Sequence, residues 1–199
     1  MWMLYTKMMK IGIDVSQLAF PNTGVANYLF NLVNQMLTLD QENEYILFFS
    51  SMRGKIGDEY ISLLEYPNVK FKSFSLPPTV LELLWNRLHI LKVEYFIGHV
   101  DIFFSSDWVQ PPTKAKNVSI VYDLIVYKYP EETHNQFRFS FKKMRIAQNI
   151  VASQKRRLFW VKKECDAIFC ISESTKSDAV KLLKIPESKL HVIYPGVTV

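Results

Sequence analysis

The chain of 199 residues can bury one large core or two small ones, and its 49% apolar and 22% charged residues are typical of a globular protein. Two cysteines are too few for a disulfide scaffold and favour a reducing compartment, while a net charge of +5 suits an anionic partner without naming one. No stretch approaches the roughly 20 apolar residues of a membrane-spanning helix, and the apolar run in residues 1–9 is too short for a signal peptide. We therefore expect a cytoplasmic protein with a dispensable leader at residues 1–9.

Strand-like and helix-like patterns alternate along the whole chain. Short apolar runs predict strands, and apolar residues at helical spacing predict the helices between them. The predicted strands are residues 11–15, 45–49, 69–74, 102–104, 118–121, 167–171 and 190–193, and the predicted helices are 25–37, 79–97, 135–164 and 174–183. This alternation predicts an α/β, Rossmann-like fold with a mostly parallel sheet of about seven strands and helices on both faces.

The loops after the strands are the places to look for a ligand, because parallel α/β sheets bind ligands at the carboxyl ends of their strands. Polar, aromatic and proline residues gather in residues 16–24, 105–112, 122–130 and 172–175. Loops are also polar for ordinary structural reasons. On loop placement alone, we expect Trp108, Tyr127 and Glu173 to line the substrate side of the site.

The first of these loops ends with Thr23 and Gly24, directly before a predicted helix. A helix N-terminus offers backbone N–H groups to an anion, and a glycine lets a ligand approach the main chain. The alternative is an ordinary capped helix, with Asn22 or Thr23 as the cap. The three-glycine dinucleotide fingerprint and the phosphate-loop motif are both missing, so we expect no bound cofactor.

Two acidic positions carry the same ambiguity. Asp123, in the segment Tyr122-Asp123-Leu124, follows a predicted buried strand, where it can orient a ligand hydroxyl or cap the loop. Glu173 lies between Ser172 and Ser174 after the next strand, where serine is a favoured helix cap and glutamate suits the first turn. The four histidines and two cysteines show no metal-ligand spacing, and no Gly-x-Ser-x-Gly elbow occurs, so neither a metal site nor an esterase is indicated.

A basic stretch from Thr133 to Lys163 contains no acidic residue, and aromatic residues are interleaved in it. Such a face suits an anionic membrane surface, whereas the alternative is a solvated outer face with the aromatics packed on the sheet. A second candidate is Leu81–Phe96, with Arg87 and Lys92; nucleic acid is a weaker possibility. The residues of the first stretch are Arg138, Lys142, Lys143, Arg145, Lys155, Arg156, Arg157, Lys162 and Lys163, with Phe137, Phe139, Phe141, Phe159 and Trp160.

The order of several short motifs resembles the N-terminal domain of glycosyltransferase family 4, over residues 10–199. The motifs are Ile11-Gly12-Ile13-Asp14, Thr23-Gly24-Val25-Ala26-Asn27-Tyr28, Leu84-Trp85-Asn86-Arg87-Leu88, Asp101-Ile102-Phe103-Phe104-Ser105-Ser106, Tyr122-Asp123-Leu124, Tyr129-Pro130-Glu131, Ile171-Ser172-Glu173-Ser174-Thr175-Lys176-Ser177-Asp178 and residues 189–197. The resemblance implies the acceptor-side half of a retaining enzyme with two facing Rossmann-like domains, the GT-B architecture. It implies transfer of a hexosyl group, mannosyl as the first guess, from a nucleotide sugar to a hydroxyl of a sugar or lipid-linked sugar.

Roles follow from the same resemblance. Thr23 and Gly24 would meet the diphosphate and Tyr122 and Asp123 the reacting sugar as catalytic residues, whereas Trp108, Tyr127 and Glu173 are assigned to the acceptor by loop placement alone. The family's donor-binding C-terminal domain is absent from this chain, so we expect the chain alone to be inactive. Tyr122 and Phe104 stand where the family often has histidines, and tyrosine cannot share a histidine's acid–base role at neutral pH. The rival interpretation is a non-catalytic Rossmann-like module that binds a partner subunit or an anionic surface.

Overall fold

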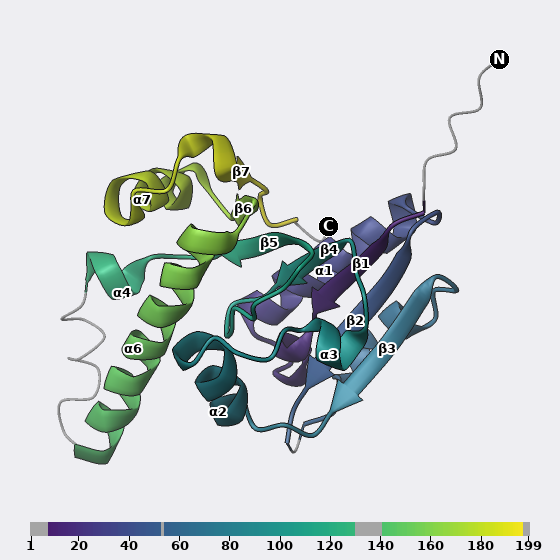
Figure 1. Cartoon of the computed structure of the whole chain (residues 1–199), viewed down its shortest axis with the longest axis horizontal. Coiled ribbons are helices and arrows are strands. Elements are labelled where there is room, and N and C mark those ends of the chain that lie inside the picture. Colours follow the sequence, from purple (N-terminus) through teal and green to yellow (C-terminus); the bar gives the residue numbers. More distant parts are fainter. Residues whose placement is uncertain (1–7, 53, 130–140, 197–199) are drawn as a thin grey trace.

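The fold is built on a seven-stranded sheet in the order β3-β2-β1-β4-β5-β6-β7, and every strand pairing is parallel (Figure 1). The structure, a computed structural model, describes residues 8–52, 54–129 and 141–196, and for residues 141–149 the backbone alone. The strands are β1 (Lys10–Asp14), β2 (Glu44–Ser50), β3 (Val69–Phe74), β4 (Ile102–Ser105), β5 (Lys116–Val121), β6 (Ala167–Cys170) and β7 (Leu190–Val192). The predicted fold class and strand number are confirmed.

Helical segments lie between most successive strands, whereas a loop without a helix joins β4 to β5. The α-helices are α1 (Gly24–Leu39), α2 (Pro78–Leu81), α3 (Glu94–Ile97), α4 (Ile125–Lys128), α6 (Phe141–Glu164) and α7 (Glu173–Leu183). Three segments are 3-10 helices, η1 (Ser16–Ala19), η2 (Asp58–Leu64) and η4 (Glu187–Lys189), and η3 (Glu82–Arg87) is a π-helix. Among the described residues, none of the helices is long and apolar enough to cross a lipid bilayer.

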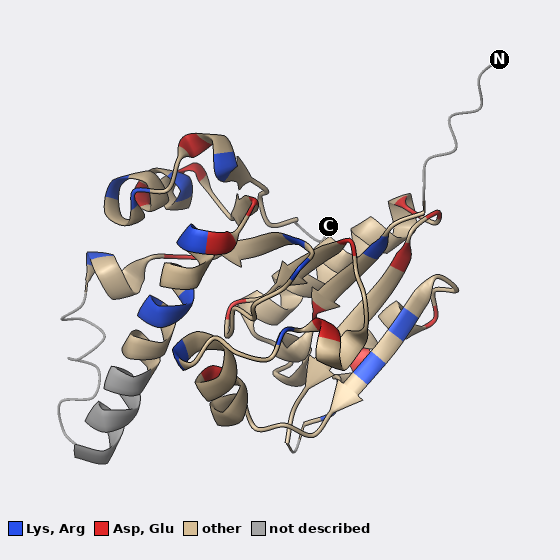
Figure 2. Cartoon of the chain, viewed as in Figure 1, with Lys and Arg blue, Asp and Glu red and all other residues tan. Residues whose placement is uncertain are grey.

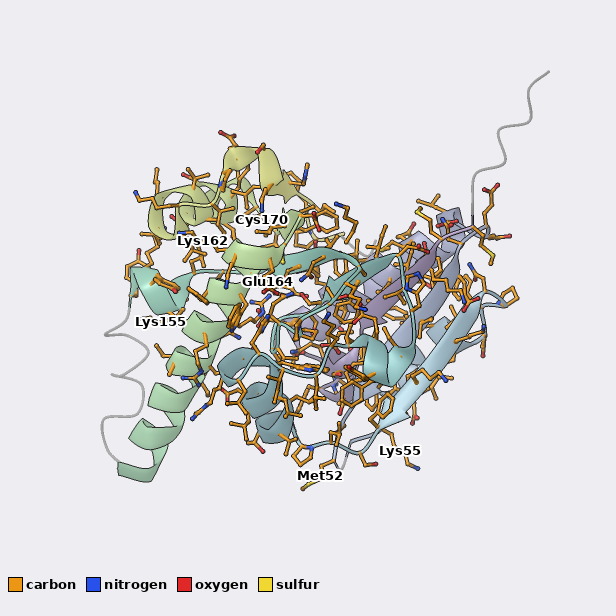
Figure 3. All side chains as sticks on the ribbon, viewed as in Figure 1. Met52, Lys55, Lys155, Lys162, Glu164 and Cys170 are labelled. Atoms are coloured by element: carbon orange, nitrogen blue, oxygen red, sulfur yellow. The ribbon has the colours of Figure 1, made fainter. Side chains whose placement is uncertain are left out.

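Both faces of the sheet are covered, as the continuous apolar run of β2 shows. Tyr45, Leu47 and Phe49 pack into the core beneath α1, whereas Ile46 and Phe48 pack into a second core beneath α2, η3 and α3. Side chains alternate between the two faces of a strand, so a strand buried on both faces is apolar at every position. A third core joins β5 and β6 to α6 and α7, and it contains the free cysteines Cys165 and Cys170, the latter labelled in Figure 3.

The helix predicted over residues 79–97 is wrong in its extent. The helical backbone stops at Arg87, and His89 and Leu91 adopt left-handed φ angles of 52° and 59° before α3 begins. The indole of Trp85 donates a hydrogen bond to the Leu91 carbonyl (2.8 Å), which turns the chain back on itself. Neither glycine nor proline marks this break, because contacts from other elements cause it: the His89 ring stacks on Trp160 of α6 at 3.6 Å.

The long predicted helix over residues 135–164 is present as α6 from Phe141, and residues 135–140 lie outside the described residues. So do residues 1–7 of the expected leader. α6 runs down one side of the molecule, and Figure 2 shows basic residues at two separate levels of its described part. Lys155 belongs to the part of α6 nearest α4, where its Nζ lies 5.3 Å from the centre of the Tyr127 ring (Figure 3).

Candidate functional site

The carboxyl ends of β1 and β4 lie side by side at the point where the strand order reverses. The chain builds β2 and β3 outward from one side of β1, then returns to build β4 to β7 on the other. Loops that leave neighbouring strands toward opposite sides open a crevice, which is where doubly wound sheets bind ligands. The polar groups at this edge therefore define the candidate site.

A buried carboxylate joins the two central strands at this edge. Ser106, directly after β4, donates a hydrogen bond from its hydroxyl to Oδ2 of Asp14, the last residue of β1, over 2.9 Å. Asp14 is 1% exposed and Ser106 is fully buried. Burial raises the pKa of the Asp14 carboxyl above its usual 3.8, and hydrogen bonds from Ser16 and Ser106 partly oppose that shift. A buried carboxylate kept next to a crevice is more typical of a functional site than of a core.

The loop after β4 is fixed by a buried arginine from α6. Arg157 is 1% exposed, and its guanidinium donates to the Ser106 carbonyl, to Oδ1 of Asp107 (both 3.2 Å) and to the Ser119 hydroxyl (3.2 Å). It also donates to the carbonyl of Ile120. One side chain thus holds the ends of β4 and β5 against α6. The planar fork of arginine, with five donors, suits this arrangement.

Asp107, the carboxylate partner of Arg157, is the partly exposed member of this hydrogen-bond network. Its side chain is 24% exposed, and Gln154 donates to its backbone carbonyl at 2.9 Å. Burial raises the pKa of Asp107 to about 6, with the charge of Arg157 lowering it and the charge of Asp123 raising it. The carboxyl therefore titrates close to neutral pH, unlike an ordinary surface aspartate.

Tyr122 places an unpaired hydroxyl in this edge of the sheet. It follows β5, is 8% exposed, and its buried hydroxyl has no hydrogen-bond partner among the described residues. Its ring meets that of Tyr28 edge-on, with centroids 5.4 Å apart, and its carbonyl accepts a hydrogen bond from Thr175. Burial raises the pKa of the Tyr122 hydroxyl, and the charge of Asp107 adds to the shift. The hydroxyl therefore stays protonated at neutral pH and is available as a donor.

A small pocket, with a free volume of about 20 Å³, lies between the loop after β1 and the loop after β4. Its lining residues are Asp14, Ser16, Gln17, Phe20, Ser50, Pro78, Leu81, Trp108 and Val109. The rings of Phe20 and Trp108 stack at its rim, 13° from parallel with centroids 5.3 Å apart. Asn86 of η3 fixes the Trp108 segment, because its amide donates to the Trp108 carbonyl and its oxygen accepts from the Gln110 N–H, both at 3.0 Å.

Comparison with known proteins decides the family of this chain. The family model of Glycosyltransferase Family 4 matches residues 22–199, which is most of the chain. The chain belongs to glycosyltransferase family 4. No curated protein matches it. A crystal structure of Anabaena Alr3699/HepE in complex with UDP is similar over 96% of this chain and 44% of that chain, at 13% identity and a TM-score of 0.41. The chain thus spans less than half the length of that structure.

In this family 4 domain, the residues predicted for the diphosphate lie at the start of α1. Thr23 is the N-cap: its hydroxyl accepts from the Ala26 N–H at 3.2 Å and donates to the Phe20 carbonyl at 3.0 Å. Gly24 is exposed, and a Cβ built on it would meet nothing within 4 Å. No neighbouring atom therefore requires glycine at this position, so a requirement would have to come from a ligand.

Of the other predicted site residues, three do not line the pocket at the carboxyl edge of the sheet. Asp123 is exposed, and its carboxylate accepts from the Ile125 N–H at 3.1 Å, which is the loop-capping alternative. Glu173 is exposed in the first turn of α7, after the N-cap Ser172. Tyr127 is half-buried on α4 beneath Lys155. Trp108 alone of these lines the pocket that contains Asp14.

The family 4 domain also contains site residues that sequence reasoning missed or misplaced. Arg157 was expected on the basic surface, but it is buried in the site. Arg157 precedes Val161 by four residues and Cys165 by eight, and both of these are fully buried, so Arg157 lies on the core face of α6. This helical spacing is the feature of the sequence that could have identified Arg157 as buried. Gln17, Phe20 and Asp107 carry no local motif. Within the described residues, no group of three or more His, Cys, Asp or Glu could hold a metal.

Proposed function

We propose that this chain is the acceptor-side, N-terminal half of a retaining glycosyltransferase. The full enzyme would transfer a hexosyl group from a nucleotide sugar to a hydroxyl of a sugar or lipid-linked sugar, and a mannosyl group is the first candidate. The family match over residues 22–199 supports glycosyl transfer in general. The observation that supports this location of the site is the buried hydroxyl of Tyr122, which has no partner among residues 8–52, 54–129 and 150–196 and lies next to the Asp14–Ser106 link at the carboxyl edge of the sheet.

The N-terminus of α1 is the proposed contact for the donor diphosphate. Thr23 satisfies the N–H groups of Ala26 through its hydroxyl and of Asn27 through its carbonyl. The N–H groups of Gly24 and Val25 remain as donors at the positive end of a 16-residue helix. This end can stabilise negative charge that develops on a leaving diphosphate.

Tyr122 is the proposed contact for the reacting sugar. Its hydroxyl stays protonated at neutral pH, so it can donate a hydrogen bond but cannot act as a general base. Transfer with retention of the anomeric configuration would then depend on positioning of the two substrates and on stabilisation of the developing charge, and the leaving diphosphate would accept the proton of the acceptor hydroxyl. Asp123 acts here through its charge, which raises the pKa of Asp107, and its loop cap holds α4.

The donor is a substrate, and the proposal includes no cofactor and no metal. The chain alone is proposed to be inactive, because the charged clamp for the diphosphate would come from a second domain. Each missing charge-assisted hydrogen bond weakens binding by about 1.5–3 kcal/mol. The site of action is proposed to be the cytoplasm, with peripheral membrane contact.

Calorimetric titration of the chain with GDP-mannose and UDP-glucose tests whether the chain alone carries only part of the donor-binding site. We expect dissociation constants of roughly 1 mM or weaker for both nucleotide sugars, and no hydrolysis or transfer. Low-micromolar binding of either one would show that the chain carries a complete donor site, against the proposal. The rival, a non-catalytic module, is favoured if a two-domain protein containing this chain never turns over a nucleotide sugar.

A further inference from the structure

A larger pocket lies beside α3 (Figure 1), at the edge of the sheet opposite the proposed transfer site. Its free volume is about 380 Å³, and its lining residues are Lys92, Glu94, Tyr95, His99 and Lys114. His99 and Lys114 come shortly before β4 and β5, so they lie at the amino ends of these parallel strands. The volume falls within the usual range of small-molecule sites, about 300–1,000 Å³. A small molecule bound here would not touch the crevice at the carboxyl ends.

Hydrogen bonds between α3 and the loop before β5 fix the walls of this pocket. The Lys114 N–H (2.6 Å) and the Thr113 hydroxyl (2.7 Å) both donate to Oε1 of Glu94. The Val93 N–H also donates to the Pro112 carbonyl, over 3.1 Å, and so adds a further link between the same two segments. The pocket is therefore formed by the fold itself, before any ligand binds.

The two lysines of the pocket have no acidic partner. Neither ammonium lies within ion-pair distance of a carboxylate in the part of the chain that the structure describes, whereas Lys70 and Lys128 each form such a pair. Glu94 instead holds the loop through Oε1, and its Oε2 is buried with no hydrogen-bond partner among the described residues. With two lysines against one glutamate, the lining keeps a net positive charge. Both ammonium groups are free to bind an anion.

Tyr95 gives the pocket an aromatic wall. It is 78% exposed, so its ring takes no part in the hydrophobic cores, and the aliphatic stems of the two lysines add apolar surface. The side chain of His99 is 79% exposed, and its Nε2 lies 3.8 Å from Oδ1 of Asp101. Inorganic phosphate would leave much of the 380 Å³ empty, whereas a phosphate ester has an organic part that can cover the Tyr95 ring.

We infer that this pocket binds a small phosphate monoester, with Lys92 and Lys114 on the phosphate and Tyr95 against the organic part. A phosphate monoester carries about −1.5 to −2 charges at neutral pH. Two unpaired lysines suit that charge better than the single charge of a carboxylate or a phosphodiester. The inference goes beyond the proposed function, because the proposed donor contact at the start of α1 follows the carboxyl end of β1 and this pocket lies at the amino edge.

Amide NMR of the chain with glucose 6-phosphate tests the site. We expect shifts at residues 92–99 and 113–115, with a dissociation constant on the order of 1 mM, because the site is open to water. Lys92→Ala and Lys114→Ala should each weaken binding about tenfold and leave the melting temperature unchanged, since each removes one charge-assisted hydrogen bond to the ligand. Lys72→Ala, which replaces an exposed lysine of β3, is the matched control and should leave binding unchanged.

Other ligands separate the parts of the inference. Methyl α-glucopyranoside, which has the sugar ring without the phosphate, should cause no shifts. Tyr95→Ala should weaken binding of glucose 6-phosphate more than binding of inorganic phosphate, because it removes only the contact with the organic part.

Vesicles distinguish a lipid headgroup from a soluble ester as the source of the phosphate. Capture by phosphatidic acid vesicles above capture by phosphatidylglycerol vesicles of equal charge, lost in Lys114→Ala, would identify the lipid monoester; binding of glucose 6-phosphate without such capture would identify a soluble one. The inference is overturned if neither monoester binds, if binding is unchanged in both lysine variants, or if methyl α-glucopyranoside causes the same shifts as glucose 6-phosphate.

Discussion

Nη1 of Arg157 lies 3.2 Å from Oδ1 of Asp107, from a guanidinium that is only 1% exposed. The same guanidinium donates to the Ser106 carbonyl, and the Ser106 hydroxyl donates to Asp14. Through these bonds, Arg157 of α6 holds the loop after β4 in place. Ser106 of that loop binds the buried Asp14 carboxylate, and Trp108 of the same loop lines the small pocket. Arg157 acts in this account as a positioning residue.

Replacing Arg157 should destabilise the whole domain. Arg157→Met leaves the Asp107 carboxylate and two carbonyls without their donor, and breaking a buried ion pair costs about 3–5 kcal/mol. Arg87→Met is the matched control, because Arg87 pairs with Glu82 at 2.9 Å from a side chain that is 50% exposed, and such surface pairs contribute about 0–1 kcal/mol. Urea unfolding of both variants measures the difference, and equal losses would contradict the positioning role.

Asp107 should titrate near pH 6, well above the usual 3.8. Asp123→Asn should lower this pKa, because it removes a repelling charge. Because the folded-state pKa is raised, the protonated carboxyl favours the fold, and this contribution is lost as pH rises from about 4 to about 6. Carbon-13 NMR of the side-chain carboxyl measures the pKa. A value at or below 4 in the wild type, or a rise in Asp123→Asn, would contradict the assigned causes.

Tyr122→Phe should separate function from stability. The hydroxyl has no hydrogen-bond partner in the part of the chain that the structure describes, so its removal should leave the unfolding free energy unchanged or raise it by up to about 1 kcal/mol. Turnover of a two-domain protein should nevertheless fall markedly, because a donor to the reacting sugar is lost. Tyr60→Phe is a useful contrast, since the Tyr60 hydroxyl donates to Asn27 at 2.9 Å and its loss should lower stability. Full activity in Tyr122→Phe would reduce Tyr122 to a packing role.

Contact with an anionic membrane stays a prediction, and the structure changes which residues would make it. Arg157 and Leu158 face the core, and the side chains of residues 130–149 lie outside the described residues. Exposed apolar residues instead gather in the segment that holds the second basic candidate, where Leu83, Leu88, Ile90 and Leu91 flank Arg87. The two basic residues of this segment are offset by Glu82 and Glu94, so the segment would contribute apolar contact, and attraction to an anionic leaflet would come from the chain's net charge of +5.

Co-sedimentation with vesicles tests this contact. Anionic vesicles should capture the chain, neutral vesicles should not, and salt should release it, because each basic residue near an anionic leaflet contributes about 1 kcal/mol. Leu88→Glu should weaken capture, whereas Leu39→Glu, an 83% exposed leucine at the end of α1, should not. Equal recovery in the supernatant with both vesicle types at low salt would identify the segment as ordinary surface.

Much of the fold could be predicted from the sequence, because local patterns determine it. The run Tyr45–Phe49 is apolar at every position since β2 is covered on both faces, and Thr23 is recognisable as a helix cap from residue type and place. The break after Arg87 could not be predicted, because it depends on His89 stacking on Trp160, which lies 71 residues further along the chain.

The candidate site was only partly predictable for the same reason. Trp108 was predicted from its place after a strand and Tyr122 from its place in a family motif, whereas Gln17, which is buried in the structure, carries no motif. Arg157 belongs to a run of basic residues, whose composition predicts an exposed side chain. Its position on the helix instead places it on the face of α6 that is buried in the core. Features that depend on long-range packing are not encoded in short motifs.

The measurement that tests the central claim most directly is the rate of nucleoside diphosphate release from GDP-mannose and UDP-glucose, with a saccharide acceptor present. It compares this chain with a two-domain protein in which the chain precedes a family 4 donor-binding domain. The account predicts release and retained sugar transfer from the two-domain protein and none from the chain alone. Release by the chain alone, or none by the two-domain protein with either donor, would contradict it.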